Sequence, residues 1–154
     1  MKKASYFLAL LIVIAISAIG GWLTSNGMDW YATINLPSWT PAGSIIGLVW
    51  TGIFILATLS IWFFLSAANR NTRFYQIVGL YLFNGFLNIL WSYLFFNQHL
   101  INLATWEAGL LGLSVVILII SIWPISKPSA SLLIPYAAWV TFATYLTYSV
   151  AALN

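Results

Sequence analysis

Residues Gly27 to Trp50, GMDWYATINLPSWTPAGSIIGLVW, interrupt a chain that otherwise consists of long apolar runs. Pro37 and Pro41 each fix φ and lack a backbone N–H, and each pushes the residue before it towards an extended conformation. The stretch 36–41 is therefore predicted to be non-helical. The next helix is expected to begin near Pro41 to Gly43.

The same stretch is rich in aromatic side chains. Trp30, Tyr31 and Trp39 are large amphipathic rings, which suit a water–lipid boundary or the mouth of a cavity. We interpret residues 24–44 as an ordered lid, called the lid below, that lies against a helix bundle. The alternative is an interfacial loop whose aromatic rings only anchor it among lipid headgroups.

The composition predicts an integral membrane protein. Of 154 residues, 62% are hydrophobic and only 5% are charged, whereas globular chains are roughly half apolar. The absence of cysteine excludes disulfides and thiolate chemistry. The net charge of +3 comes from basic residues scattered at the ends of apolar runs, so no nucleic-acid partner is expected.

Five apolar segments are each close to the roughly 20 residues that cross a bilayer as a helix. They cover residues 4–23, 45–67, 77–96, 103–123 and 132–153. Short connections favour an up-and-down bundle, so we predict an all-α integral membrane protein of five transmembrane helices, one domain over 1–154, with a structured loop between the first two helices. The first segment also resembles a secretory signal peptide, but its length favours a retained helix.

The basic residues predict the orientation of the bundle. With five crossings, Lys2, Lys3, Arg70, Arg73 and Lys127 all fall on one side. Under the positive-inside rule the N-terminus is cytoplasmic, and the lid and the C-terminus are outside a bacterial plasma membrane. No internal repeat is visible, which argues against an inverted-repeat transporter.

Three predicted helices carry aromatic or amide side chains at helical spacing. Such faces suit either a pocket for a flat apolar ligand with a few polar edges, or plain core packing with the amides bonded across helices. Their convergence beneath an aromatic lid favours the pocket. The faces comprise Asn84, Asn88, Trp91 and Phe95, then Trp50, Phe54 and Ala57, then Trp139, Ala143 and Leu146.

Metal and acid–base chemistry have little support. His99 is the one histidine, and a single histidine without cysteine or paired carboxylates does not make a zinc or haem-iron site. Asp29 and Glu107 are the two acids, and nothing in the sequence pairs them. Glu107 follows Asn102, which we interpret as an N-cap, so a negative charge near a helix start is the expected role of Glu107.

Small residues spaced four apart can bring helices close within a bundle or between two chains. Gly43 and Gly47 form one such pair, and Ala108 and Gly112 form another. We expect Gly43 and Gly47 to pack within the bundle. A homodimer remains an open alternative.

Taken together, these motifs resemble the translocator protein family, also called tryptophan-rich sensory proteins, which includes the mitochondrial peripheral benzodiazepine receptor. The resemblance covers most of the chain. It rests on Trp30-Tyr31, Leu36-Pro37-Ser38-Trp39-Thr40-Pro41, Val49-Trp50, Asn84, Asn88, Trp91, Phe95-Phe96, Pro135-Tyr136, Trp139 and Phe142-Ala143.

The resemblance implies a pocket under the first loop that binds porphyrin-type tetrapyrroles such as protoporphyrin IX, and benzodiazepine and isoquinoline-carboxamide ligands. Protoporphyrin IX would be a ligand or substrate, and no further cofactor is implied. The family's ligand-binding positions, with Leu146 added by helical spacing, are Tyr31, Pro41, Trp50, Phe54, Asn84, Asn88, Trp91, Trp139, Ala143 and Leu146.

Relatives of this kind are also credited with light- and oxygen-dependent breakdown of porphyrin. For that reaction the resemblance makes Trp50 and Trp139 the candidate catalytic residues, as electron donors beside a stacked ring. Two alternatives stay open: a carrier that moves porphyrins or other apolar ligands across or along the membrane, and a structural membrane protein with no pocket.

The chain departs from the family pattern in two places. The proposed cholesterol motif needs Lys or Arg shortly after a tyrosine, and neither Tyr145 nor Tyr148 is followed by one. Sterol binding by that route is therefore not expected. Thr147 stands where many relatives carry asparagine, so one polar contact at that end of the helix differs.

Overall fold

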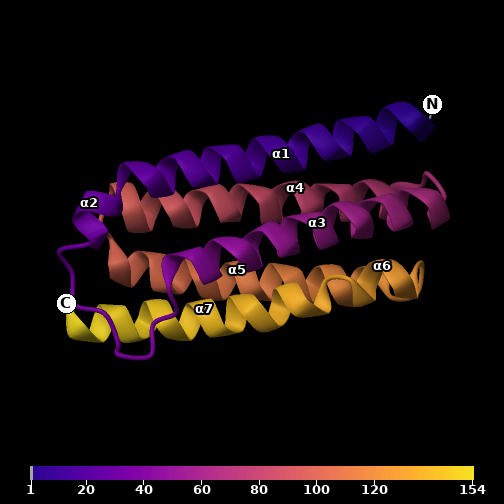
Figure 1. Cartoon of the computed structure of the whole chain (residues 1–154). Helices are drawn as coiled ribbons and strands as arrows, with labels where there is room; N and C mark the ends of the chain where they lie inside the picture. The colour runs from indigo at the N-terminus through magenta and orange to yellow at the C-terminus, as the bar shows by residue number, and fades with distance from the viewer. Residues whose placement is uncertain (1) are drawn as a thin grey trace.

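The computed structural model describes residues 2–154 and contains five long helical spans (Figure 1). Each span is long and apolar enough to cross a membrane. The predicted all-α five-helix bundle is confirmed. The elements in chain order are α1 (Lys2–Asn26), α2 (Met28–Tyr31), α3 (Gly43–Ala67), α4 (Thr72–Ser92), the π-helical turn η1 (Tyr93–Asn97), α5 (Ile101–Ile122), α6 (Lys127–Ser131) and α7 (Ile134–Leu153).

The long helices form an antiparallel bundle. α5 packs along both α4 and α7, whereas α1 lies against α3 and α4 (Figure 1). The main core lies where α3, α4, α5 and α7 meet, around buried side chains such as Phe64, Leu118 and Val140.

Helix α4 begins before the expected start at residue 77. The side chain of Asn71 accepts a hydrogen bond from the backbone N–H of Phe74, 3.0 Å away, and so caps the helix. Hydropathy alone misses this polar first turn, which includes Arg73. A second polar cap, Ser126, starts the separate short helix α6 before α7.

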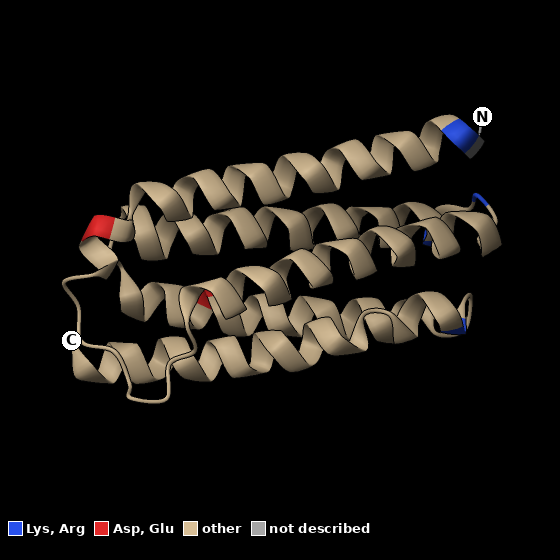
Figure 2. Ribbon diagram, in the orientation of Figure 1, with Lys and Arg blue, Asp and Glu red and all other residues tan. Residues whose placement is uncertain are grey.

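Apart from Glu107 within α5, the charged residues of the described chain lie near the two ends of the bundle (Figure 2). Lys3, Arg70, Arg73 and Lys127 lie at the end that we call the basic end, and Asp29 lies with the lid at the opposite lid end. This arrangement is the one that five crossings predict. Which end faces the cytoplasm stays a prediction from the positive-inside rule.

Packing against α7 orders the non-helical part of the lid, residues 32–42. The ring of Trp39 stacks on Tyr145, with 5.5 Å between centroids, and meets Phe142 edge-on at 5.9 Å. The backbone N–H of Asn35 donates to Oδ1 of Asn154 at 2.9 Å, and Nδ2 of Asn154 donates back to the Asn35 carbonyl at 2.9 Å. The predicted structured loop between the first two transmembrane helices is confirmed.

The start of the lid touches the π-helical turn. A Cβ on Gly27 would lie 2.6 Å from Cβ of Phe96 and 2.8 Å from its carbonyl carbon, so only glycine fits here. The π-helical turn lets both Phe95 and Phe96 be buried beneath α2. The lid end of α1 is therefore fixed closely to the end of α4.

The expected packing of Gly43 and Gly47 within the bundle is wrong. Both glycines are exposed, and a Cβ on either would meet nothing within 4 Å, because this face of α3 points away from the other described helices. The second pair of small residues, Ala108 and Gly112, packs within the bundle. Ala108 is buried, and a Cβ on Gly112 would lie 3.4 Å from Cγ1 of Val140 on α7. Close approach of α5 and α7 follows.

Candidate ligand-binding site

A hydrogen-bonded cluster of polar side chains lies inside the bundle. The Tyr136 hydroxyl donates to Oδ1 of Asn84 at 3.0 Å, and Nδ2 of Asn84 donates to Oγ of Ser114 at 2.8 Å. Nδ2 of Asn88 donates to the Tyr136 hydroxyl oxygen. Amides inside an apolar bundle need such partners. This polar cluster joins α4, α5 and α7 at one level.

Aromatic side chains of α3 lie beside the polar cluster. Trp50 meets the ring of Tyr136 edge-on, with 6.1 Å between centroids, and lies 5.8 Å from Phe54. Phe54 lines the same cavity as Asn84 and Asn88, and Trp50 contacts the tyrosine that bonds both amides. Trp50, Phe54, Asn84 and Asn88 are thus brought together as the helical spacing predicted, and Tyr136 joins them.

Trp139 and Ala143 lie further along α7 towards the lid. The ring of Trp139 lies 5.2 Å from that of Phe142, which also contacts Trp39 of the lid. The indole N–H of Trp139 is buried and has no hydrogen-bond partner among residues 2–154. Ala143 and Pro41 are both half-buried, Ala143 on α7 and Pro41 in the lid. A buried donor without a partner is free to bind a ligand.

The other three predicted residues belong to a second cluster, under α2. Trp91 stacks on Phe95 at 5.1 Å, and Tyr31 lies 5.7 Å from Phe96. Leu146 packs against the same group. Burial raises the pKa of the Tyr31 phenol above its ordinary value. Tyr31, Trp91 and Leu146 therefore pack together with Phe95 and Phe96 at the base of the lid.

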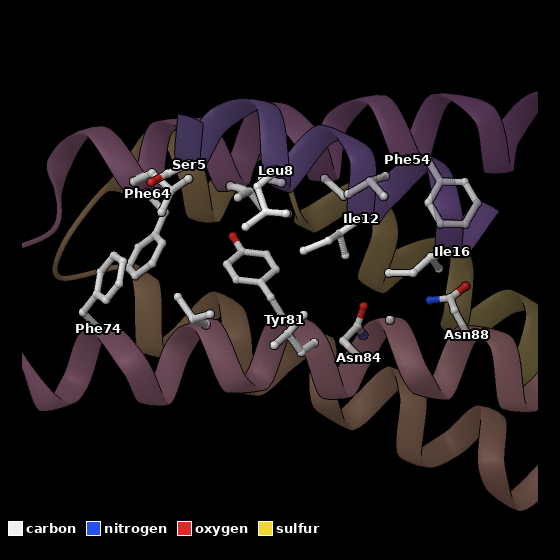
Figure 3. A pocket seen from close by; sticks show the side chains of 18 of the residues that line it. Ser5, Leu8, Ile12, Ile16, Phe54, Phe64, Phe74, Tyr81, Asn84 and Asn88 are labelled. Carbon is white, nitrogen blue, oxygen red and sulfur yellow. The ribbon is translucent and has the colours of Figure 1, made fainter. Parts of the chain in front are cut away.

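A cavity of about 290 Å³ adjoins the polar cluster on the side of α1 (Figure 3). Phe54, Asn84, Asn88 and Tyr136 line one end of it, and the amides of Asn84 and Asn88 point into it from α4. The cavity then runs between α1, α3 and α4 towards the basic end. The other predicted site residues do not line it.

Comparison with known proteins places the chain in a family. The model of the TspO/MBR family matches residues 8–153. The chain belongs to the TspO/MBR family. It is 32% identical to the tryptophan-rich protein TspO of Bacillus cereus over 154 residues, covering 100% of this chain and 99% of that protein.

More distant TspO/MBR relatives match over most of their length. Identity is 31% over 157 residues to the tryptophan-rich protein TspO of Chlorobaculum tepidum, covering 100% of this chain and 99% of that one. It is 28% over 130 residues to the human translocator protein, covering 81% and 75%. Family membership and five apolar spans together identify an integral, multi-pass membrane protein.

In this TspO/MBR protein the role predicted for Glu107, stabilisation of a helix start, is wrong. Helix α5 begins at Ile101 with Leu100 at the N-cap and no side-chain cap, so Asn102 is inside the helix. Glu107 lies in the second turn, is only 6% exposed, and neither carboxylate oxygen has a hydrogen-bond partner among the described residues. Glu107 is therefore an interior group and does not stabilise a helix start.

Neither Tyr136 nor Ser114 was predicted to be a partner of the two asparagine amides. Tyr136 was visible within the Pro135-Tyr136 motif, three residues before Trp139 and so on the same face of α7. Ser114 carried no comparable signal, because serine is common in transmembrane helices and bonds its own helix, as it does here to the Leu111 carbonyl at 2.7 Å.

Proposed function

We propose that this TspO/MBR protein binds porphyrin-type tetrapyrroles, protoporphyrin IX among them, between the polar cluster and the lid. The observation that carries the proposal is the contact of Trp50 with Tyr136, whose hydroxyl is hydrogen-bonded to Asn84 and Asn88. An aromatic wall beside a few fixed polar groups suits a flat apolar ligand with polar edges. Benzodiazepine and isoquinoline-carboxamide ligands are also flat and apolar with polar edges, so they would compete with porphyrins for this position.

Each predicted residue has a distinct part in this binding mode. Trp50, Phe54 and Trp139 offer ring faces, while Asn84 and Asn88 offer polar contacts at the ligand edge. The unpartnered indole N–H of Trp139 is a further donor for a ligand acceptor. The small side chain of Ala143 would let a flat ligand approach α7 closely, Pro41 belongs to the lid, and Tyr31, Trp91 and Leu146 support the lid.

The ligand reaches this position only when the lid lifts. Trp39 lies on Phe142 and Tyr145 of α7, and Asn35 is bonded to Asn154 at the end of the same helix. Breaking these contacts frees residues 32–42 without unfolding a transmembrane helix. Lid opening would therefore limit the rate of binding more than its affinity.

A titration with protoporphyrin IX in the dark tests the proposal. Soret absorbance is followed for the wild type, for Ala143→Phe, which adds a ring at a half-buried position of α7 towards the lid, and for Ala138→Phe, a matched control at an exposed position of α7. We expect Ala143→Phe to raise the dissociation constant at least tenfold, which is about 1.4 kcal/mol. Equal affinities of the two variants would contradict the proposed position.

Light- and oxygen-dependent breakdown of the bound porphyrin is a second candidate function, favoured by the position of Trp139, a half-buried residue whose indole N–H is buried without a partner among the described residues. Product formation is measured under illumination at saturating porphyrin in wild type and Trp139→Phe. A rate that falls in the variant while porphyrin stays bound would support a role for the indole. A wild-type rate equal to that of free porphyrin in detergent would contradict breakdown by the protein.

A further inference from the structure

The cavity between α1, α3 and α4 extends well beyond the polar cluster, away from the lid (Figure 3). Along α1 its lining residues run from Ser5 to Ile16, a distance of about 16 Å at 1.5 Å per helical residue. Its volume of about 290 Å³ is at the low end for a small-molecule site, where the usual range begins near 300 Å³. A long, narrow space of this kind fits a chain better than a flat ring system.

The walls of this cavity are apolar along most of its length. Leu8, Ile12, Phe64 and Val78 contribute side chains from the three helices. Tyr81 also lines the cavity, and its hydroxyl already has a partner: it lies 2.8 Å from Oγ of Ser60, which donates to the Ser129 carbonyl at 2.8 Å. The walls therefore offer hydrophobic contact and little hydrogen bonding to an occupant.

A second hollow of about 270 Å³ adjoins the cavity at the basic end. The two share Ser5, Leu65, Arg70 and Phe74, but the second hollow is also lined by Ser66 and Asn69 and is more polar. Of the described residues that line either space, Arg70 alone is charged. Its guanidinium donates to Oγ of Ser5 at 3.3 Å and lies 5.9 Å from the Phe74 ring centroid.

The cavity is accessible from the lipid phase between α1 and α4. Three of its lining residues are at least half exposed: Leu8 on α1 at 57%, and Tyr75 and Leu82 on α4 at 63% and 50%. Towards the lid the same two helices close, since a Cβ on Gly85 would clash with the Ile16 side chain. The opening therefore lies in the half of the bundle nearer the basic end.

We propose that these two spaces together bind a single-chain lipid with an anionic head group, of which a fatty acid is the simplest example. The chain lies between α1, α3 and α4, and the head group lies in the polar hollow beside the Arg70 guanidinium. An anion there gains a charge-assisted hydrogen bond and meets no acidic side chain. The site is separate from the proposed tetrapyrrole position and adjoins it at Phe54, Asn84 and Asn88.

Binding of tritiated palmitate to the protein in phosphatidylcholine nanodiscs tests the charge requirement. Arg70→Gln removes the proposed head-group contact. Arg73→Gln is the matched control, because Arg73 lines neither space and donates to the Ser121 carbonyl at 3.2 Å. We expect saturable binding that weakens at least fivefold in Arg70→Gln only. Binding that is not saturable, or that is equal in the two variants, would overturn the proposal.

A second pair of variants tests the chain position. Ala9→Phe fills the cavity from α1, whereas Ala15→Phe adds the same ring at an exposed position of α1 outside it. Palmitate binding should be lost in Ala9→Phe and kept in Ala15→Phe, and hexadecanol, which lacks the charge, should bind more weakly than palmitate to the wild type. Equal binding of palmitate and hexadecanol would overturn the anionic preference. The protoporphyrin titration on the same variants reports separately on the tetrapyrrole site and on correct folding.

Discussion

At the scale of single residues, Tyr136 connects the candidate site, because its hydroxyl contacts both Asn84 and Asn88. The spacing of the two asparagines was enough to predict that they face the interior, since amides are costly in lipid. Their partner could not be predicted from spacing, because a tyrosine on a distant helix becomes a neighbour only after the bundle forms.

Tyr136→Phe should destabilise the protein by about 1–2 kcal/mol, because it leaves an amide donor and an amide acceptor without their partner inside the bundle. The measurement is the free energy of unfolding in mixed micelles titrated with dodecyl sulfate. Tyr148→Phe is the control, since Tyr148 is 60% exposed. Equal stability of the two variants would contradict the role given to the cluster.

Glu107→Met should raise the midpoint of thermal unfolding in detergent, because it replaces a buried carboxyl group that has no hydrogen-bond partner in residues 2–154 with an apolar chain of similar size. Asp29→Asn, at an exposed acid of the lid end, should leave the midpoint unchanged. A lower midpoint for Glu107→Met would mean that the carboxyl group makes a stabilising interaction.

At the scale of elements, the end of the first transmembrane helix depends on a close backbone contact. The sequence predicted a lid after this helix from Pro37 and Pro41, whose effect on the backbone is local. It did not predict the π-helical turn at Tyr93–Asn97 or its contact with Gly27, because both depend on how the ends of α1 and α4 meet.

Gly27→Ala should cost about 1–3 kcal/mol of stability, since the added Cβ would overlap the backbone of Phe96, which cannot move aside as a side chain could. Gly21→Ala is the matched control: its Cβ would meet nothing within 4 Å, and alanine favours the helix slightly. Thermal unfolding of both variants in the same detergent gives the comparison. An equal loss of stability in both variants would contradict the role given to the contact between Gly27 and Phe96.

At the scale of the whole molecule, hydropathy and charge were enough to predict five helices and the gathering of basic residues at one end. The position of the cavity was not predictable, since it depends on how α1 lies across α3 and α4. The hydrogen bonds that join the lid to the end of α7 were also not predicted, because Asn35 and Asn154 are 119 residues apart in the chain.

Asn154→Ala should speed porphyrin association several-fold with a smaller change in affinity, because it removes hydrogen bonds that hold the lid to α7. Stopped-flow mixing with protoporphyrin IX in the dark measures the rate. Ser149→Ala is the control, since that hydroxyl donates only within α7, to the Tyr145 carbonyl. An unchanged rate in Asn154→Ala would contradict the requirement for lid opening.

The most direct test of the central claim is tryptophan fluorescence quenching by protoporphyrin IX in the dark. The wild type is compared with Trp50→Phe at the proposed site and with Trp106→Phe, whose ring is 81% exposed on the outer face of α5. Saturable quenching that weakens in Trp50→Phe and is unchanged in affinity in Trp106→Phe is the predicted result. Linear, non-saturable quenching alike in all three proteins would mean partition into detergent and would contradict a binding site under the lid.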